Sequence, residues 1–223
     1  MSKLICFDFD GTMVDTWRPF EALAQRYTSE NKLPPICIES LKVGYGYPEE
    51  YTFWEGLSRE GQIEHLHRMY RIMDDPDHQL MDGVMPATFD GVPDTLETLK
   101  SMGYTLAIVT AKPKLPMQAL LQHHKMDQHF CGFRTHDDIQ GRGERCKPYP
   151  DQLLSVIREL DFTPDSTVMI GDTCMDIKMA NAAKVKSIGV TWGNHCETRL
   201  TEAGANHVLS CQFPSIADIV KNL

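Results

Sequence analysis

Two carboxylates near the amino terminus stand at a spacing that suits metal binding or phosphoryl chemistry. They belong to a DFDGT run at residues 8–12, which ends the first apolar segment of the chain. Side chains alternate along a strand, so Asp8 and Asp10 are expected on the same side. Two such charges repel unless a cation lies between them or one is protonated. Gly11 lets the backbone turn sharply, so that the amides beyond the strand can face an anion.

A second acidic motif, GDTCMD, occupies residues 171–176 and also follows an apolar segment. The carboxyl ends of parallel strands line one crevice, so Asp8 and Asp172 are expected at the same mouth. Carboxylate oxygens suit Mg²⁺ better than a soft metal. Asp176 has two interpretations at this stage, a contribution to the metal site or a charge at a helix end.

Two further residues complete a possible phosphate site. Thr110 ends the apolar segment 105–110, and Lys147 lies in a proline-rich stretch. We expect Lys147 to neutralise the phosphate and the Asp8 carboxylate, while the Thr110 hydroxyl and the Ala111 amide bind phosphoryl oxygens. Alone, each residue is explained as well by an ordinary strand end or a solvated loop. Their order along the chain, together with the two acidic motifs, favours the site.

Composition and charge exclude several classes of protein. The chain has 223 residues, 42% of them hydrophobic, and no apolar run approaches the roughly 20 residues that cross a bilayer. Its 22 basic and 31 acidic residues give a net charge of −9, which opposes nucleic-acid binding. The seven scattered cysteines contain no CxxC pair, and the amino-terminal residues do not resemble a secretory signal. We therefore expect a cytoplasmic protein with reduced thiols and no membrane or nucleic-acid partner.

A parallel sheet would bring these motifs together, and the hydrophobic pattern predicts one. Short apolar segments alternate with segments of helical periodicity, which is typical of an α/β fold. We expect a Rossmann-like parallel sheet with helices on both faces. The expected strands cover residues 4–9, 105–110, 167–170, 187–191 and 207–209.

The segment that follows the first strand breaks this alternation. Phe20, Leu23, Ala24 and Tyr27 recur on one helical face, and proline and glycine clusters divide the whole segment into three or four helices. We predict an inserted α-helical domain at residues 16–85. The Rossmann-like core then consists of residues 1–15 and 86–223.

In this order, the motifs resemble the series found in the haloacid dehalogenase-like hydrolase superfamily. The series is DFDGT, Thr110, the Lys147-Pro148 element and GDTCMD, and it spans the whole core. The helical insertion is similar to the cap domain of the phosphoglycolate phosphatase and β-phosphoglucomutase branch. Two late stretches, GVTWG at 189–193 and AGANH at 203–207, are similar to stretches of phosphoglycolate phosphatase-like members.

The resemblance implies a role for each motif residue. Asp8 is the expected nucleophile, and Asp10 is the expected acid that protonates the leaving oxygen and then activates water. Mg²⁺ is expected on Asp8, the Asp10 carbonyl and Asp172, with Asp176 binding directly, through water, or by positioning Lys147. The expected phosphate-binding residues are Gly11, Thr12, Thr110, Ala111 and Lys147.

Several other positions have more than one interpretation or depart from the family pattern. Relatives often have asparagine where this chain has Ala111, so that only the backbone amide serves there. Lys112 either faces the substrate or solvent, and solvent is slightly favoured. In the insertion, Tyr45, Tyr47 and Arg59 are candidates for substrate contact, although aromatic residues in a helical insertion more often pack its core.

The pattern as a whole predicts a magnesium-dependent phosphatase that acts on a small phosphorylated metabolite, with phosphoglycolate as the first candidate. A phosphomutase of the β-phosphoglucomutase type shares the same core and stays open. A non-enzymatic phospho-receiver or binding module also has the acidic pair, threonine and lysine, but does not need a large insertion. A dehalogenase is disfavoured because its reaction does not need the proton-transfer group that Asp10 supplies. Monomer and homodimer both stay open.

Overall fold

The computed structural model describes residues 2–44, 52–75, 84–210 and 213–223. The chain forms two compact units, Met1–Asp15 with Thr88–Leu223, and Thr16–Ala87. Strands β2 (Val14–Asp15) and β3 (Ala87–Thr88) stand where the chain leaves and re-enters the first unit.

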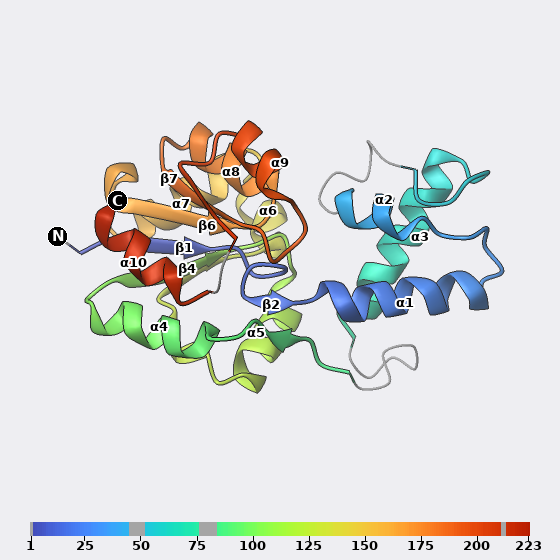
Figure 1. Ribbon diagram of the computed structural model, residues 1–223, viewed down its shortest axis with the longest axis horizontal. Coiled ribbons are helices and arrows are strands. Elements are labelled where there is room, and N and C mark those ends of the chain that lie inside the picture. Colours follow the sequence, from blue (N-terminus) through green and yellow to red (C-terminus); the bar gives the residue numbers. More distant parts are fainter. Residues whose placement is uncertain (1, 45–51, 76–83, 211–212) are drawn as a thin grey trace. The chain divides into compact units, whose positions relative to one another are not determined.

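A six-stranded parallel sheet forms the centre of the first unit, in the order β5-β4-β1-β6-β7-β8 (Figure 1). This confirms the predicted α/β fold with a Rossmann-like sheet. Five strands match predicted apolar segments, whereas β5 has no counterpart among them. The strands are β1 (Leu4–Phe7), β4 (Thr105–Val109), β5 (Gly132–Arg134), β6 (Thr167–Gly171), β7 (Lys186–Val190) and β8 (His207–Leu209).

Helices cover both faces of this sheet. On one face, α7 and α8 bury apolar side chains such as Leu153 and Met179 against Cys6 of β1. On the other face, Phe7 stacks on Phe213, just before α10, which in turn packs against α4. The helices of this unit are α4 (Val92–Ser101), α5 (Lys114–His123), α6 (His136–Arg142), α7 (Asp151–Glu159), α8 (Cys174–Ala182), α9 (Glu197–Glu202) and α10 (Ser215–Asn222).

The central strand β1 determines which loops meet. Its four residues are fully buried because it lies between β4 and β6. The register pairs Phe7 with Ile108 on one side and with Ile170 on the other. The backbone N–H of Asp8 then donates to the Ile170 carbonyl at 2.8 Å. Residues that follow β1, β4 and β6 therefore emerge side by side at the carboxyl edge of the sheet.

The inserted unit is built from helices in the part that the structure describes. These are α1 (Trp17–Glu30), α2 (Ile38–Val43) and α3 (Arg59–Met73). The predicted apolar face of α1 is buried and joins Leu66 and Met69 of α3 in one core. At its centre the Trp54 indole donates to the Thr28 hydroxyl at 3.0 Å. The described residues of this unit also include an isolated antiparallel β-bridge between Ile36 and Trp54.

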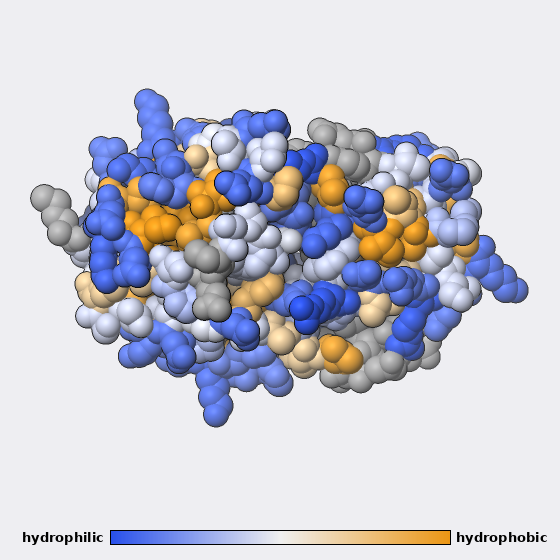
Figure 2. Space-filling view, in the orientation of Figure 1, coloured by the Kyte–Doolittle hydropathy of each residue, from blue (hydrophilic) through white to orange (hydrophobic). Residues whose placement is uncertain are grey.

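Polar residues dominate the visible surface. Figure 2 shows hydrophilic side chains over most of this face of each unit, with hydrophobic residues in smaller groups. Within the described ranges, no helix combines the length and apolar character needed to cross a bilayer.

Candidate active site

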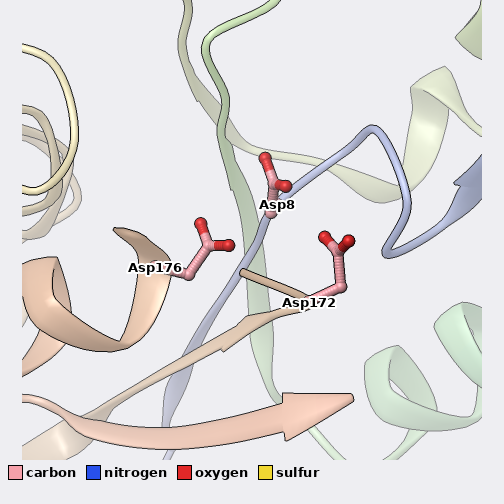
Figure 3. A group of neighbouring side chains, drawn as sticks. All are labelled: Asp8, Asp172 and Asp176. Atoms are coloured by element: carbon pink, nitrogen blue, oxygen red, sulfur yellow. The ribbon is translucent and has the colours of Figure 1, made fainter. Parts of the chain in front are cut away.

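Three buried carboxylates converge at the carboxyl edge of the sheet. Asp8 follows β1, Asp172 follows β6, and Asp176 lies in the first turn of α8. One oxygen from each lies within 4.8 Å of the others, and Figure 3 shows the three carboxyl groups directed to the same side. Hard carboxylate oxygens grouped in this way suit a divalent cation such as Mg²⁺.

Lys147 bridges two of these carboxylates. Its Nζ lies 2.7 Å from Asp8 Oδ1 and 2.6 Å from Asp176 Oδ1, and its side chain is only 8% exposed. Burial by itself lowers the pKa of Lys147, but the Asp176 and Asp8 carboxylates outweigh burial and raise the pKa above its ordinary value. The ammonium therefore stays charged. One cation beside three carboxylates still leaves an excess of negative charge, which a divalent cation can offset.

Asp176 is held by both of its oxygens. The Thr173 backbone N–H and hydroxyl donate to Asp176 Oδ2 at 3.1 and 2.6 Å, and these contacts belong to a capping box at the start of α8. Asp176 Oδ1 pairs with Lys147. Gly171 leaves room for this carboxylate, since a Cβ there would lie 2.3 Å from Asp176 Cγ. Both interpretations of Asp176 thus have a basis, because it caps a helix and also positions Lys147.

Asp172 is fixed by contacts from two separate loops. The Thr12 hydroxyl donates to Asp172 Oδ1 at 2.9 Å, and the Asn194 backbone N–H donates to Oδ2 at 2.8 Å. Gly11 has a φ of +77°, and a Cβ there would meet Asp172 Oδ2 at 2.4 Å. Glycine is therefore required at position 11 both for the turn and for close approach to the carboxylate.

The loop at residues 192–195 was not assigned a role from the sequence. Besides the Asn194 contact, the Trp192 indole donates to the Thr12 carbonyl at 3.0 Å. A Cβ at Gly193 would lie 2.3 Å from Asp172 Oδ2, so only glycine fits there. Similarity of the GVTWG stretch to phosphatase relatives was the available signal. A loop that acts mainly through backbone amides and a glycine shows no pattern of reactive side chains.

Burial and mutual repulsion raise the pKa values of two of the carboxyl groups. For Asp8, burial is the largest cause, and the neighbouring Asp176 and Asp172 add to it, so its pKa lies well above the ordinary value despite the opposing Lys147. For Asp172, burial and then Asp176 raise the pKa to about 7, against hydrogen bonds from Asn194 and Thr12. Without a cation, both groups resist ionisation.

We expect the metal-free protein to lose stability as the pH rises from about 4 to about 7. In this interval unfolded Asp172, with a pKa near 3.8, has released its proton, while folded Asp172, with a pKa of about 7, retains it. The native state then binds more protons, so stability falls with rising pH, by up to about 1.4 kcal/mol per pH unit for each such carboxyl group. Thermal unfolding in EDTA between pH 5 and pH 7.5 measures this loss.

The matched variant for this measurement is Asp172→Asn, which keeps the shape of the side chain and removes its ionisation. It should show a shallower decline in melting temperature with pH than the parent protein. Mg²⁺ should raise the melting temperature of the parent more at pH 7.5 than at pH 5. A parent protein whose EDTA melting curve is as stable at pH 7.5 as at pH 5 would contradict the description of this cluster.

Thr110 follows β4 and lies at the same edge of the sheet. Its backbone N–H donates to the Arg134 carbonyl at 2.8 Å, which anchors it to β5. Its Oγ1 accepts from the Lys112 backbone N–H at 3.1 Å. Because a hydroxyl both donates and accepts, this contact leaves the hydroxyl hydrogen for a donor role. Ala111 is exposed beside it.

Lys112 does not face solvent, so that expectation was wrong. Its side chain is 6% exposed, and its Nζ lies 3.5 Å from Asp10 Oδ1. The backbone of Lys112 is held on both sides, since its N–H donates to Thr110 and its carbonyl accepts from the His136 N–H at 3.1 Å. The carboxylate that attracts the side chain lies about a hundred residues away in sequence, where local composition gives no hint of it.

Asp10 is positioned by a turn rather than by strand alternation. The β1 ladder ends at Phe7, and Asp10 forms an isolated bridge with Val14. The described carboxylates that group with Asp8 belong to the second acidic motif, not to Asp10. The argument from alternation at the end of the first strand therefore does not apply to Asp10.

The described contacts of Gly11 and Thr12 lie within the protein, and phosphate binding by these two residues stays a prediction. The Gly11 N–H donates to the Val14 carbonyl at 2.8 Å, and the Thr12 hydroxyl donates to Asp172. Both groups are thus used to shape the loop and to hold the Asp172 carboxylate. In the insertion, Tyr45 and Tyr47 lie outside the described residues, and Arg59 begins α3.

Comparison with known proteins gives consistent matches. A family model described as haloacid dehalogenase-like hydrolase matches residues 5–190. The chain is 28% identical over 201 residues to a phosphoglycolate phosphatase of Pseudomonas putida, covering 87% of this chain and 72% of the relative. It is 27% identical over 196 residues to the pyrophosphatase PpaX of Bacillus mycoides, covering 84% and 83%. A haloacid dehalogenase-like family hydrolase of Streptococcus pneumoniae has a similar fold, with a TM-score of 0.78 at 21% identity over 98% of each chain.

Proposed function

Because this chain belongs to the haloacid dehalogenase-like hydrolase family and is a phosphatase, we propose that it hydrolyses a small phosphorylated metabolite with Mg²⁺ and an Asp8 nucleophile. The observation that supports this proposal most is the buried cluster of Asp8, Lys147, Asp172 and Asp176. It combines a nucleophile, a fixed cation and hard oxygen ligands at one edge of the sheet.

The donor set fits Mg²⁺. Asp8 and Asp172 supply carboxylate oxygens. Burial first, and then the neighbouring carboxylates, raise their pKa values, so a bound divalent cation would favour their ionised forms. We assign the Asp10 backbone carbonyl as a third ligand, as the family resemblance implies, and we assign Asp176 the positioning of Lys147. When bound, Mg²⁺ offsets the negative charge of the phosphoryl oxygens and of the Asp8 carboxylate.

In the first half-reaction, an Asp8 carboxylate oxygen attacks phosphorus and the bond from phosphorus to the ester oxygen breaks. Asp10 donates a proton to that departing oxygen. Lys147 holds Asp8 at 2.7 Å and stabilises the charge that develops on the phosphoryl group. The Thr110 hydroxyl donates to a phosphoryl oxygen. The product of this step is a phosphoryl group on Asp8 and a free alcohol.

In the second half-reaction, water attacks the phosphorus of the aspartyl phosphate. Asp10, now ionised, accepts a proton from that water, and the bond from phosphorus to Asp8 breaks. Inorganic phosphate leaves, Asp8 regains its carboxylate, and Asp10 is again protonated. Each residue thereby returns to its starting state.

Phosphoglycolate is the first candidate substrate because a relative carries that name, and pyrophosphate is a second for the same reason. We assign the unit at Thr16–Ala87 the role of a cap that selects the substrate, as the family resemblance implies. A unit with its own hydrophobic core can vary its exposed residues without disturbing the catalytic sheet.

The test is phosphate release from a panel of phosphorylated metabolites. We expect release from at least one monoester in the presence of Mg²⁺, with a loss of at least about 100-fold when EDTA removes the metal. The panel includes phosphoglycolate, pyrophosphate, β-glucose 1-phosphate, glucose 6-phosphate and p-nitrophenyl phosphate. Isomerisation of β-glucose 1-phosphate without net phosphate release would identify a mutase instead. A long-lived phosphoprotein that releases phosphate from no ester would identify a phospho-receiver.

A further inference from the structure

Lys112 is a buried cation with no part in the reaction described so far. Its side chain is 6% exposed although lysine is almost never this buried without a charged partner. Hydrogen bonds of its N–H to Thr110 and of its carbonyl to His136 hold its backbone. Burying an ammonium group and ordering a long side chain both cost free energy of folding. A buried lysine at this position therefore calls for a compensating interaction.

One charged partner of this cation is Asp10. Lys112 Nζ lies 3.5 Å from Asp10 Oδ1, and the Asp10 side chain is 14% exposed. Among the described residues, no hydrogen bond reaches Asp10 Oδ1. In the part of the chain that the structure describes, the Lys112 ammonium pairs with this oxygen and restrains it. Lys147 contacts a different pair, Asp8 and Asp176, so the two lysines serve different carboxylates.

We propose that Lys112 is a positioning residue that orients the Asp10 carboxyl group for proton transfer to and from the reacting oxygen. This inference rests on the proposed function, in which Asp10 protonates the departing oxygen and then accepts a proton from water. A carboxyl group that pivots by about 1 Å loses much of its efficiency in proton transfer, because reactivity depends steeply on alignment. Lys112 restrains one Asp10 oxygen and leaves the other for the substrate.

The need for proton donation depends on the leaving group, which separates this role from substrate binding. An alkoxide leaves poorly unless it is protonated, whereas p-nitrophenolate leaves without a proton. A residue that acts through Asp10 should therefore affect the first cleavage of an alkyl phosphate far more than that of p-nitrophenyl phosphate. If Lys112 instead bound a second anionic group of the substrate, its removal would raise the half-saturating substrate concentration and leave the maximal rate of cleavage unchanged.

The experiment compares Lys112→Met with the parent on glycerol 2-phosphate and p-nitrophenyl phosphate in single-turnover assays with Mg²⁺. We expect cleavage of glycerol 2-phosphate to fall by about 10- to 100-fold, while the first release of nitrophenol changes by less than about 3-fold. Lys112→Arg should restore most of the lost rate because it keeps the cation. Lys114→Met, which removes an exposed lysine two residues away, is the matched control and should match the parent.

An Asp10→Asn background provides the second test. There Lys112→Met should cost less than about 2-fold further, since the residue through which it acts is gone. Lys112→Gln, checked by thermal unfolding, serves if the methionine variant does not fold. An equal loss with both esters, a raised half-saturating ester concentration with an unchanged maximal rate, or a full additional loss in the Asp10→Asn background would each overturn the proposal. A parent protein that cleaves neither ester would instead refute the proposed function.

Discussion

Replacing Asp8 with asparagine is expected to reduce Mg²⁺-dependent phosphate release by at least about 10⁴-fold, which is on the scale of losing a nucleophile. The amide has nearly the same shape but cannot form the acyl phosphate. Stability should respond differently from activity. Asp8 is buried, and its pKa is raised first by burial, so its ionised form is unfavourable in the metal-free fold. The variant should therefore melt in EDTA no more than a few degrees below the parent.

The two readouts together separate a catalytic from a structural role. A loss of activity with an intact melting transition is the expected result, and mass spectrometry of rapidly quenched parent protein should show a phosphoryl group that the variant lacks. Asp218→Asn removes an acid whose side chain is 82% exposed and should leave both properties unchanged. Undiminished turnover in Asp8→Asn would eliminate the proposed nucleophile.

Removal of Lys147 should impair both activity and stability. In Lys147→Met the Asp8 and Asp176 carboxylates lose a partner at 2.7 and 2.6 Å, in a setting where Asp176 is fully buried. Leaving buried charge unpaired costs on the order of 3 kcal/mol, so we expect a loss of this size at pH 8 in EDTA, measured by urea unfolding. Activity should fall by about 10³-fold, since the charge on the transferring phosphoryl group is no longer offset.

The control for the stability measurement is a lysine–aspartate pair on the surface. Lys221 Nζ lies 3.2 Å from Asp218 Oδ1, with both side chains more than half exposed, and Lys221→Met should change stability by less than about 0.5 kcal/mol. Adding Asp176→Asn to Lys147→Met should recover much of the stability but not the activity, because it removes a buried charge without restoring a cation. A Lys147→Met protein as stable as the parent at pH 8 would show that the buried pair has no such role.

Much of the fold was predictable because it follows from local patterns. Apolar segments such as residues 105–110 and 167–170 are long enough to register as buried strands, and each coincides with an observed strand. Strand β5 was missed because its three residues are a glycine, a phenylalanine and an arginine. Arg134 is buried there because Ser155 and Glu159, on α7, accept from its guanidinium. That partnership exists only once α7 packs on the sheet.

In the candidate site, too, some residues were predictable from local sequence patterns and others were not. Asp8, Asp172 and Lys147 were identified because reactive residue types recur at strand ends in a particular order, which a single sequence displays directly. The backbone amide of Asn194 and the glycine at position 193 hold Asp172 without any reactive side chain. Residues that act through their backbone leave little trace in composition or periodicity.

By itself, the sequence determined the fold class, the helical insertion, and the motif residues that make the chain a phosphatase candidate, since all of these depend on short-range patterns of residue type. The motif residues also predicted that Lys147 meets Asp8, whereas tertiary structure alone decided the distances between these groups and the partner of Lys112. Because β1 lies between β4 and β6, the Lys147 ammonium reaches both Asp8 and Asp176, and Lys112 turns inward to Asp10 instead of outward to water. Coulombic attraction acts between neighbours in space, and the order of strands in the sheet determines those neighbours.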